Sequence, residues 1–345
     1  MHRLTSAVVP LTTVVSLSLA AIPASAADPV AEFYGGKSIA LLVGFGPGGG
    51  YDSYGRVLAR HLGKHIPGQP MVVARNMPGA GGLAVANFLY NVAPADGLTL
   101  GMFGPFNALE PLFGNSTARF DPTKFTWIGK MDVDAGACGA WRGAGIEKFS
   151  DLQRKQVVFG SSGRGSATTQ QVLALKNMLN AKVKIVQGYK GSADITLAMR
   201  RGEVSATCGI AASSVRVQLA DDVRNGDIKM FIQFGRTNAP EFGNAENIYD
   251  LVSTSEEKQI ADIIFRPNDL GKPIASSPRL AGDRARALRD AFTNTMEDPR
   301  FLDEMDRMNL PIKTAIGEEV AQIFASLYAT PKPLIERAVA NMTTE

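Results

Sequence analysis

The chain of 345 residues carries 36 Lys and Arg residues against 33 Asp and Glu residues, which gives a formal net charge of +3 at pH 7. Because this charge is small and no basic cluster accompanies it, nucleic acid is excluded as an expected partner. The length is enough for two domains of ordinary size.

Residues 1–26 are predicted to be a cleaved signal peptide. Arg3 precedes an apolar stretch over residues 8–22, and residues 24–26 form a small-residue cleavage site. The apolar stretch is too short to cross a bilayer as a helix. Only one Arg precedes it, which disfavours the twin-arginine export route. We therefore expect cleavage after Ala26, export by the general route and a location in the periplasm.

Strand-like and helix-like segments alternate in the region that follows. In the N-terminal part the strand-like segments are residues 39–43, 71–74 and 98–103, and the helix-like segments are residues 52–65 and 83–92. In the middle, strand-like residues 157–160, 183–187 and 204–208 precede helix-like residues 166–179, 192–201 and 212–220. Such alternation predicts an α/β protein with mostly parallel sheets flanked by helices. Beyond residue 279 only helical patterns follow.

Three glycine-rich turns, residues 44–52, 76–82 and 160–168, each follow a strand-like segment and precede a helix-like one. Glycine lets the backbone approach a bound group closely, and the free N–H groups at a helix start favour an anion. In open parallel sheets, ligands bind beyond the carboxyl ends of the strands. We therefore predict an anion-binding cleft, in which the guanidinium of Arg164 could hold a carboxylate through two parallel hydrogen bonds. The candidate ligand-binding residues in these turns are Gly48, Gly49, Gly50, Tyr51, Asp52, Ala80, Gly81, Gly82, Ser161, Ser162, Arg164, Ser166 and Thr168.

Other interpretations of these turns are weaker or remain open. The G-x-G-x-x-G pattern from Gly44 lacks the acidic residue expected at the end of the next strand, and no Walker A Gly-Lys-Ser/Thr is present, which disfavours a nucleotide. The third turn has Arg164 in place of the last glycine of the hydrolase motif G-x-S-x-G. A purely structural first turn, and a Ser166 helix cap beside a solvated Arg164, remain open alternatives.

Metal binding and histidine-dependent catalysis are disfavoured. Beyond the signal peptide the only histidines are His61 and His65, and Leu62 occupies the position of the Glu in an H-E-x-x-H zinc motif. No Ser/His/acid set is visible. We therefore expect no metal, no cofactor and no enzymatic activity.

The two cysteines, Cys138 and Cys208, each lie in an apolar, strand-like stretch. Such stretches are typical of small buried thiols. An exported chain with an even number of cysteines also allows a disulfide bond between them. The sequence leaves both alternatives open.

Several short motifs occur in an order that is similar to that of a known family. They are Gly-Pro-Gly-Gly-Gly-Tyr-Asp (46–52), Asn-Met-Pro-Gly-Ala-Gly-Gly (76–82), Pro-Ala-Asp-Gly (94–97), Phe-Thr-Trp-Ile-Gly (125–129), Gly-Ser-Ser-Gly (160–163), Tyr-Lys-Gly (189–191) and Gly-Glu-Val (202–204). Together they resemble the Bug family, the periplasmic solute receptors of tripartite tricarboxylate transporters, over almost the whole chain beyond the signal peptide. The resemblance implies a two-lobed type II periplasmic binding protein, or Venus flytrap. Lobe 1 would hold residues 27–130 and 236–345 and lobe 2 residues 131–235, with crossings near residues 129–132 and 233–236.

The resemblance also implies how a ligand is held. One carboxylate would lie between the first two glycine turns, and the third turn would approach from the other lobe. Tyr51 and Arg164 replace smaller residues of many relatives, and Gly209 replaces an Asp that suits ligands with an amino group. Arg164 could therefore pair with a second carboxylate, with an apolar wall between the two ends. The remaining candidate ligand-binding residues are Phe45, Phe106, Asn107, Tyr189 and Gly209.

We therefore expect a monomeric receptor for a small organic carboxylate, with a dicarboxylate that has an aliphatic or aromatic spacer as the favoured ligand. The ligand would be delivered chemically unchanged to membrane transporter subunits. Two alternatives remain open: an exported α/β enzyme acting on phosphate or carboxylate esters, and a module that senses a ligand for a membrane kinase.

Overall fold

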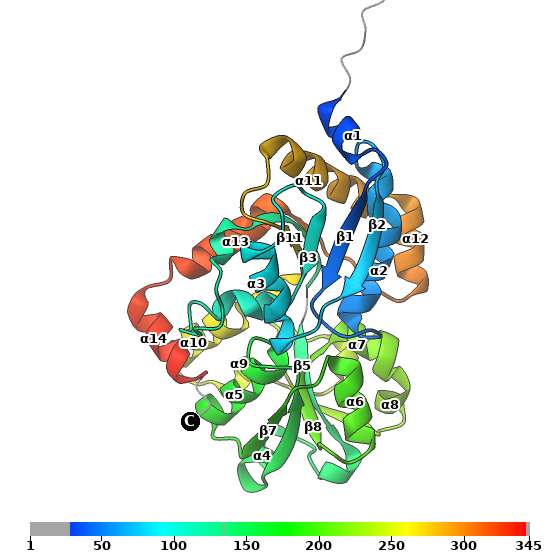
Figure 1. Ribbon diagram of the computed structural model, residues 1–345. Helices are drawn as coiled ribbons and strands as arrows, with labels where there is room; N and C mark the ends of the chain where they lie inside the picture. Colours follow the sequence, from blue (N-terminus) through cyan, green and yellow to red (C-terminus); the bar gives the residue numbers. More distant parts are fainter. Residues whose placement is uncertain (1–27, 134, 343–345) are drawn as a thin grey trace, which may run out of the picture.

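Two six-stranded sheets form the centres of two lobes (Figure 1). The computed structural model describes residues 28–133 and 135–342, so the expected signal peptide lies outside the described residues. In spatial order, the strands of the first sheet are β12 (Ala315–Ile316), β4 (Thr126–Asp132), β11 (Gly271–Ser276), β3 (Thr99–Met102), β1 (Ser38–Val43) and β2 (Met71–Asn76). The strands of the second sheet are β10 (Glu246–Asn247), β9 (Ile228–Gln233), β5 (Gly136–Trp141), β8 (Ala206–Ala211), β6 (Val157–Ser161) and β7 (Val183–Gln187).

The strand directions show how the chain passes between the lobes. In the first sheet β1 is parallel to β2 and β3, whereas β11 is antiparallel to β3 and β4, and the edge strand β12 is antiparallel to β4. In the second sheet β6 is parallel to β7 and β8, whereas β5 is antiparallel to β8 and β9. Each inner antiparallel strand is the first strand after a crossing, since β5 follows β4 of the other sheet and β11 follows β10. The predicted two-lobed α/β fold is therefore confirmed, but the sheets are mixed: in the first sheet, three of the five strand pairings are antiparallel.

The second crossing lies further along the chain than expected. The first crossing falls between Asp132, the last residue of β4, and Gly136, the first residue of β5. We expected the second crossing near residues 233–236, but β10 pairs with β9 in the second sheet. The chain therefore returns to the first sheet only between Asn247 and Gly271. With two residues, β10 is too short to show a strand pattern in the sequence.

Helices cover both faces of the first sheet (Figure 1). On one face lie α2 (Gly50–Leu62), α11 (Gly282–Glu297) and α12 (Pro299–Arg307), and on the other lie α3 (Leu83–Asn91) and α13 (Gly317–Tyr328). The sequence of α2 shows why this packing forms, because its buried residues Tyr54, Val57 and Leu58 recur at the spacing of one helix face. This packing fixes the start of α2, and with it the first glycine turn, at the carboxyl end of β1.

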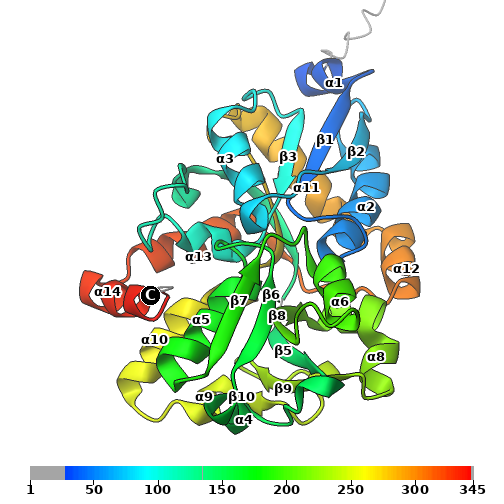
Figure 2. The same ribbon diagram turned by 60° about the horizontal axis from the view of Figure 1, so that its bottom comes forward.

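The second sheet has α5 (Ala167–Leu179) and α10 (Ser255–Phe265) on one side and α6 (Ser192–Arg200) and α8 (Ala220–Arg224) on the other (Figure 2). The C-terminal helix α14 (Lys332–Ala340) packs against α10, and the side-chain amide of Asn177 donates a hydrogen bond to the carbonyl of Asn341 at 3.0 Å. The C-terminal part, which we assigned to lobe 1 alone, therefore also contacts the second lobe. The short helices are α1 (Pro29–Tyr34), α4 (Phe149–Arg154), α7 (Ala212–Ser214) and α9 (Ile248–Leu251).

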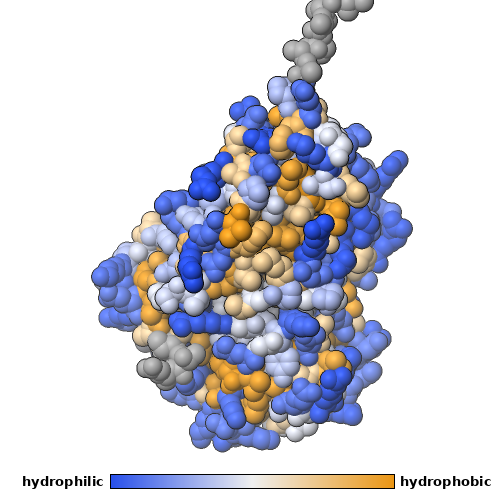
Figure 3. All heavy atoms as spheres, in the orientation of Figure 1, coloured by the Kyte–Doolittle hydropathy of each residue, from blue (hydrophilic) through white to orange (hydrophobic). Residues whose placement is uncertain are grey.

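Hydrophilic residues lie along the outer edges of both lobes on the face shown in Figure 3. Within residues 28–133 and 135–342, no helix combines the length and the apolar character that crossing a bilayer requires. Large apolar side chains that are well exposed, such as Met71 and Val92, belong to separate elements.

The structure resolves the alternatives for the two cysteines in favour of a disulfide bond. Cys138 of β5 and Cys208 of β8 lie on neighbouring antiparallel strands and are bonded to each other across a sequence separation of 70 residues. Both are buried. The bond ties the strand that enters the second lobe to the centre of that lobe's sheet.

Loss of this bond is predicted to destabilise the protein. For a closed loop of this length, the chain-entropy estimate of the stabilisation is about 4 kcal/mol. The double variant Cys138→Ala/Cys208→Ala should therefore lose about this much unfolding free energy in urea denaturation. Wild-type protein treated with a reductant should show a similar loss. An unchanged wild-type midpoint in reductant would mean that the thiols are not bonded.

Candidate functional site

A cavity of about 760 Å³, part of it open to solvent, lies between the two lobes. Its walls follow the carboxyl ends of β1, β3, β6 and β8, which is where open α/β sheets bind ligands. The residues that line it are Phe45, Gly46, Gly49, Gly50, Tyr51, Gly104, Pro105, Phe106, Gly136, Ser162, Ser166, Ala167, Thr168, Gln171, Gly191, Ser192, Gly209, Ala211, Ser213, Ser214, Asn268 and Lys272.

Half of the residues that the sequence predicted to bind a ligand line the cavity. Those that line it are Phe45, Gly49, Gly50, Tyr51, Phe106, Ser162, Ser166, Thr168 and Gly209. Those that do not line it are Gly48, Asp52, Ala80, Gly81, Gly82, Asn107, Ser161, Arg164 and Tyr189. The members of the second group make other contacts, which are described below.

The lobes touch each other around the cavity. The N–H of Gly46 in the first lobe donates a hydrogen bond to the carbonyl of Lys190 in the second lobe at 2.8 Å. The side-chain amide of Asn107 donates to the carbonyl of Gly81 at 3.0 Å and also to the carbonyl of Gly165 across the interface. The structure therefore represents a closed arrangement of the two lobes.

Glycines of the second and third turns make this closure sterically possible. A Cβ atom added to Gly81 would lie 2.8 Å from the Cβ of Ser166, and one added to Gly163 would lie 2.6 Å from the carbonyl carbon of Ala80. Contacts this short do not occur between real side-chain and backbone atoms. The second turn, which includes Gly82, therefore contacts the opposite lobe and does not line the cavity.

The first turn is held rigid by Asp52. The carboxylate of this buried residue accepts hydrogen bonds from the N–H of Gly48 at 2.9 Å, from Nε of Arg56 at 2.9 Å and from Nδ2 of Asn76 at 2.8 Å. Burial by itself raises the pKa of Asp52, but the hydrogen bonds from Arg56, Gly48 and Asn76 outweigh burial and lower the pKa. Asp52 and Gly48 thus position the turn, and Gly49, Gly50 and Tyr51 present it to the cavity.

Three hydroxyl groups of the second lobe converge at one end of the cavity. Oγ1 of Thr168 accepts a hydrogen bond from the N–H of Ser162 at 3.0 Å and lies 2.6 Å from Oγ of Ser166 and 3.2 Å from Oγ of Ser162. Ser161 lies behind these groups, where its hydroxyl contacts Thr168 and Thr169. We call Ser162, Ser166 and Thr168 the hydroxyl cluster. It lies at the N-terminus of the 13-residue helix α5, where the helix dipole favours a negative charge.

Gly209 brings only backbone to this end of the cavity. Its φ is +68°, and an added Cβ would lie 2.8 Å from the backbone nitrogen of Thr168. The N–H of Gly209 donates to the side-chain oxygen of Gln171 at 2.8 Å. No side chain from position 209 can therefore reach a ligand in this arrangement.

The structure places Arg164 outside the cavity, so the expected contact with a second ligand carboxylate is not made here. The side chain is 49% exposed, and its Nε lies 3.5 Å from Oε2 of Glu110 in the first lobe. Glu110 is only 2% exposed and also accepts hydrogen bonds from Asn115 and Gln170. A buried carboxylate attracts the nearest cation, and Glu110 is distant from Arg164 in sequence, which is why the pattern did not show this pairing.

Tyr189 also packs away from the cavity. It is half-buried against the apolar residues of the second lobe, and its ring lies near Gly160. The two histidines are held by carboxylates of the first lobe, with His61 2.6 Å from Glu304 and His65 3.0 Å from Asp298. Among the described residues, no group of three or more His, Cys, Asp and Glu side chains is arranged to hold a metal ion.

Sequence reasoning missed the opposite end of the cavity, which contains Lys272. This residue is 0% exposed, and its Nζ donates to Oγ of Ser213 at 3.1 Å and lies 3.3 Å from Oδ2 of Asp132. Residue 272 has a φ of +54°, which costs a non-glycine residue about 1 kcal/mol or more. The sequence did contain one signal for this end of the cavity, a lysine among the mostly apolar residues of β11. However, a lysine at the start of a strand is ordinarily exposed to solvent.

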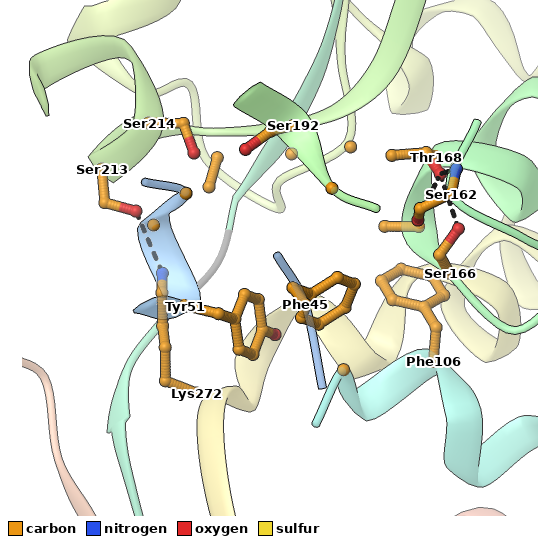
Figure 4. Close-up of a pocket in the computed structure, with 18 of the residues that line it drawn as sticks. Phe45, Tyr51, Phe106, Ser162, Ser166, Thr168, Ser192, Ser213, Ser214 and Lys272 are labelled. Carbon is orange, nitrogen blue, oxygen red and sulfur yellow. Dashed lines mark hydrogen bonds between the residues drawn. The ribbon is translucent and has the colours of Figure 1, made fainter. Parts of the chain in front are cut away.

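The cavity therefore has two polar ends and an aromatic middle (Figure 4). The hydroxyl cluster lies beside Phe106 at one end, and Lys272 and Ser213 lie at the other. Between them lie the rings of Phe45 and Tyr51, whose centroids are 4.6 Å apart. Chemically, this arrangement suits a small molecule with an apolar body and hydrogen-bonding or charged ends.

Solved structures of periplasmic binding proteins share this fold of two α/β lobes that close over a cavity at their strand ends. The periplasmic binding protein BugD has a TM-score of 0.67 at 16% identity, covering 88% of this chain and 98% of that chain. MatC from Rhodopseudomonas palustris, solved with bound malate, has a TM-score of 0.68 at 16% identity, covering 89% of this chain and 99% of that chain.

In sequence, the chain is 24% identical over 333 residues to the UPF0065 protein in the gbd 5′ region of Cupriavidus necator, covering 93% of each chain. No family model matches the chain. The predicted resemblance to the Bug family is confirmed at the level of the fold by BugD and MatC.

Glu110 should make stability depend on pH. Burial raises its pKa above the ordinary 4.5, and the hydrogen bonds of Asn115 and Gln170 and the charge of Arg164 offset this only in part. The unfolded chain therefore loses the proton at a lower pH than the folded chain, so the stability falls as the pH rises above 4.5 and levels off above the raised pKa. The variant Glu110→Gln should lack this fall, so its melting temperature should gain on that of the wild type as the pH rises above about 4.5.

The variant Arg164→Gln is a second test, since removing the nearby positive charge should raise the pKa of Glu110 further and extend the fall in stability to higher pH. The melting temperatures of all three proteins are measured by scanning calorimetry across this pH range. Parallel curves for wild type and Glu110→Gln would contradict the assignment.

Proposed function

We propose that this protein is a periplasmic receptor that captures a small organic carboxylate between its lobes and delivers it unchanged, as a monomer, to a tripartite tricarboxylate-type membrane transporter. The observation that carries the proposal is the hydroxyl cluster at the N-terminus of α5, facing the first glycine turn across the closed cavity. Hydroxyl groups and a helix N-terminus together favour a carboxylate, and closure removes it from water. The similarity to BugD and to malate-bound MatC supports this choice of ligand class and membership of the Bug family.

The capture would proceed in two steps. The rigid first turn, Gly49 to Tyr51, offers backbone groups to the ligand in the open form, and the hydroxyl cluster then reaches it as the second lobe closes. Hydrogen bonds to a charged group contribute about 1.5–3 kcal/mol each, so several can offset the desolvation of a carboxylate. Closure changes the shape that a membrane partner recognises.

The chemistry of the lining favours a receptor over an esterase. The one feature that suggests an enzyme is the hydrogen bond from Lys272 to Ser213, which resembles a Ser–Lys pair. However, the ammonium of Lys272 is also paired with Asp132, so it donates a hydrogen bond to Ser213 and cannot accept its proton. Among the described residues that line the cavity, none is Asp, Glu, His or Cys, the usual groups for proton transfer.

Removing hydroxyl groups from the cluster should weaken binding. Thr168→Val and Ser162→Ala should each raise the dissociation constant for a bound carboxylate by about 10- to 100-fold, because a hydrogen bond to a charge is lost. Isothermal titration calorimetry with malate, succinate and adipate measures this effect. Native mass spectrometry of the purified wild type should first reveal any acid that is already bound.

Ser326→Ala is the matched control, since Ser326 lies on the surface of α13 and its hydroxyl bonds only to the carbonyl of Ile323. It should bind as the wild type does. Turnover of p-nitrophenyl acetate or p-nitrophenyl phosphate that depends on Ser213 would instead establish an enzyme. A protein that binds no mono-, di- or tricarboxylate would also sink the proposal.

A further inference from the structure

We propose that Lys272 is the specificity-determining residue of the cavity, which selects ligands that carry a second anionic group at the end opposite the hydroxyl cluster. The inference rests on the proposed function and assigns this selection to a residue near the crossings between the lobes. It replaces the earlier expectation that Arg164 would hold the second carboxylate.

The first argument is electrostatic. Of the described residues that line the cavity, Lys272 alone carries a formal charge at neutral pH. Lys272 lines this end of the cavity but is almost fully buried, and Asp132, which lies 3.3 Å from the ammonium, does not line the cavity. An anionic group that reaches this end gains Coulomb energy from the ammonium, and a cationic group is repelled.

The second argument is that the surrounding groups orient Lys272. The carboxylate of Asp132 also accepts a hydrogen bond from the hydroxyl of Tyr54 at 3.0 Å, and both residues are buried. The Nζ of Lys272 lies over the ring of Tyr54, 4.7 Å from its centroid, and 5.9 Å from the ring centroid of Tyr51 in the cavity wall. Carboxylate, ring faces and hydroxyl therefore fix the ammonium in one place, which lowers the entropic cost of binding an anion there.

The third argument is the position of Lys272 relative to the two crossings. Lys272 is the second residue of β11, where the chain has just returned from the second lobe, and Asp132 is the last residue of β4, where the chain leaves the first. Ser213, which accepts the hydrogen bond from Lys272, belongs to α7 of the second lobe. A ligand group at Lys272 thus contacts the point at which the lobes are joined. At this position Lys272 has a positive φ, a backbone conformation that residues with a side chain normally avoid.

The experiment compares matched ligands on the wild-type protein. Sets of four, five and six carbons each offer a dicarboxylate, the monocarboxylate of equal length and the ω-amino acid, for example adipate, hexanoate and 6-aminohexanoate. Isothermal titration calorimetry should show that, at the best length, the dicarboxylate binds about 10- to 100-fold more tightly than the monocarboxylate. The ω-amino acid should bind more weakly still. Equal binding of all three at every length would overturn the inference and leave the proposed function intact.

The variants then assign the preference to Lys272. The double variant Lys272→Met/Asp132→Asn removes the ammonium without leaving a buried carboxylate unpaired. It should bring the dicarboxylate and monocarboxylate within about threefold of each other, mainly by weakening the dicarboxylate. Arg164→Gln is the control for loss of a cation outside the cavity and should keep the wild-type preference. If the double variant keeps that preference, Lys272 is not the selecting group.

Two further outcomes keep the test decisive. If the double variant does not fold, Lys272→Arg, which keeps the charge but moves its position, should shift the preferred dicarboxylate length, and an unshifted length would count against Lys272. If the wild type binds no carboxylate in any set, the proposed function fails and the inference fails with it. These results are distinguishable because the first concerns selectivity and the second concerns binding itself.

Discussion

The closed cavity depends on positions at which the chain carries no side chain. Gly81 and Gly163 meet residues of the opposite lobe at distances that leave no room for a Cβ atom, and Gly46 donates a backbone hydrogen bond across the same interface. Any larger residue at the first two positions would hold the lobes apart and leave the cavity wet. The glycines of the second turn therefore have a different purpose from those of the first turn. They let the lobes approach each other, whereas Gly49 and Gly50 bring backbone to the cavity.

Closure gives importance to the few charges that remain near the ligand. In a region with little water, an unpaired charge is costly, and the protein pairs its buried charges before a ligand arrives. Asp52 is neutralised by Arg56 of α2, and Glu110 is partnered by Arg164 outside the cavity. The ligand is thus left to face hydroxyl groups, aromatic rings and Lys272. This division explains how Asp52 and Glu110 can lie close to the proposed anion-binding site without repelling the anion.

The sequence predicted what depends on neighbouring residues and missed what depends on topology. The strand–turn–helix pattern is local, so the α/β fold, the first turn from Gly49 and the hydroxyl cluster could be anticipated from it. The division into two lobes was implied by the family resemblance. Lys272 lies 140 positions from its partner Asp132, and the two meet only because β11 pairs with β4. The pairing of Arg164 with Glu110 was missed for the same reason, since no local pattern reveals a buried carboxylate of the other lobe. β10 was missed because two residues carry no periodic signal.

The location of Lys272 links recognition to closure in a way that a residue on the surface of one lobe could not. A ligand shifts an equilibrium between open and closed forms only by its difference in affinity for them. A group bound by the first turn alone has contacts that exist before closure and adds little to that difference. The hydroxyl cluster adds to it from the second lobe, and Lys272, which is bonded to Ser213 across the cleft, adds to it from the point where the lobes are joined. A ligand too short to reach both ends would occupy the open form without favouring the closed one, so the protein would distinguish its ligand by length and end charge through the closed state.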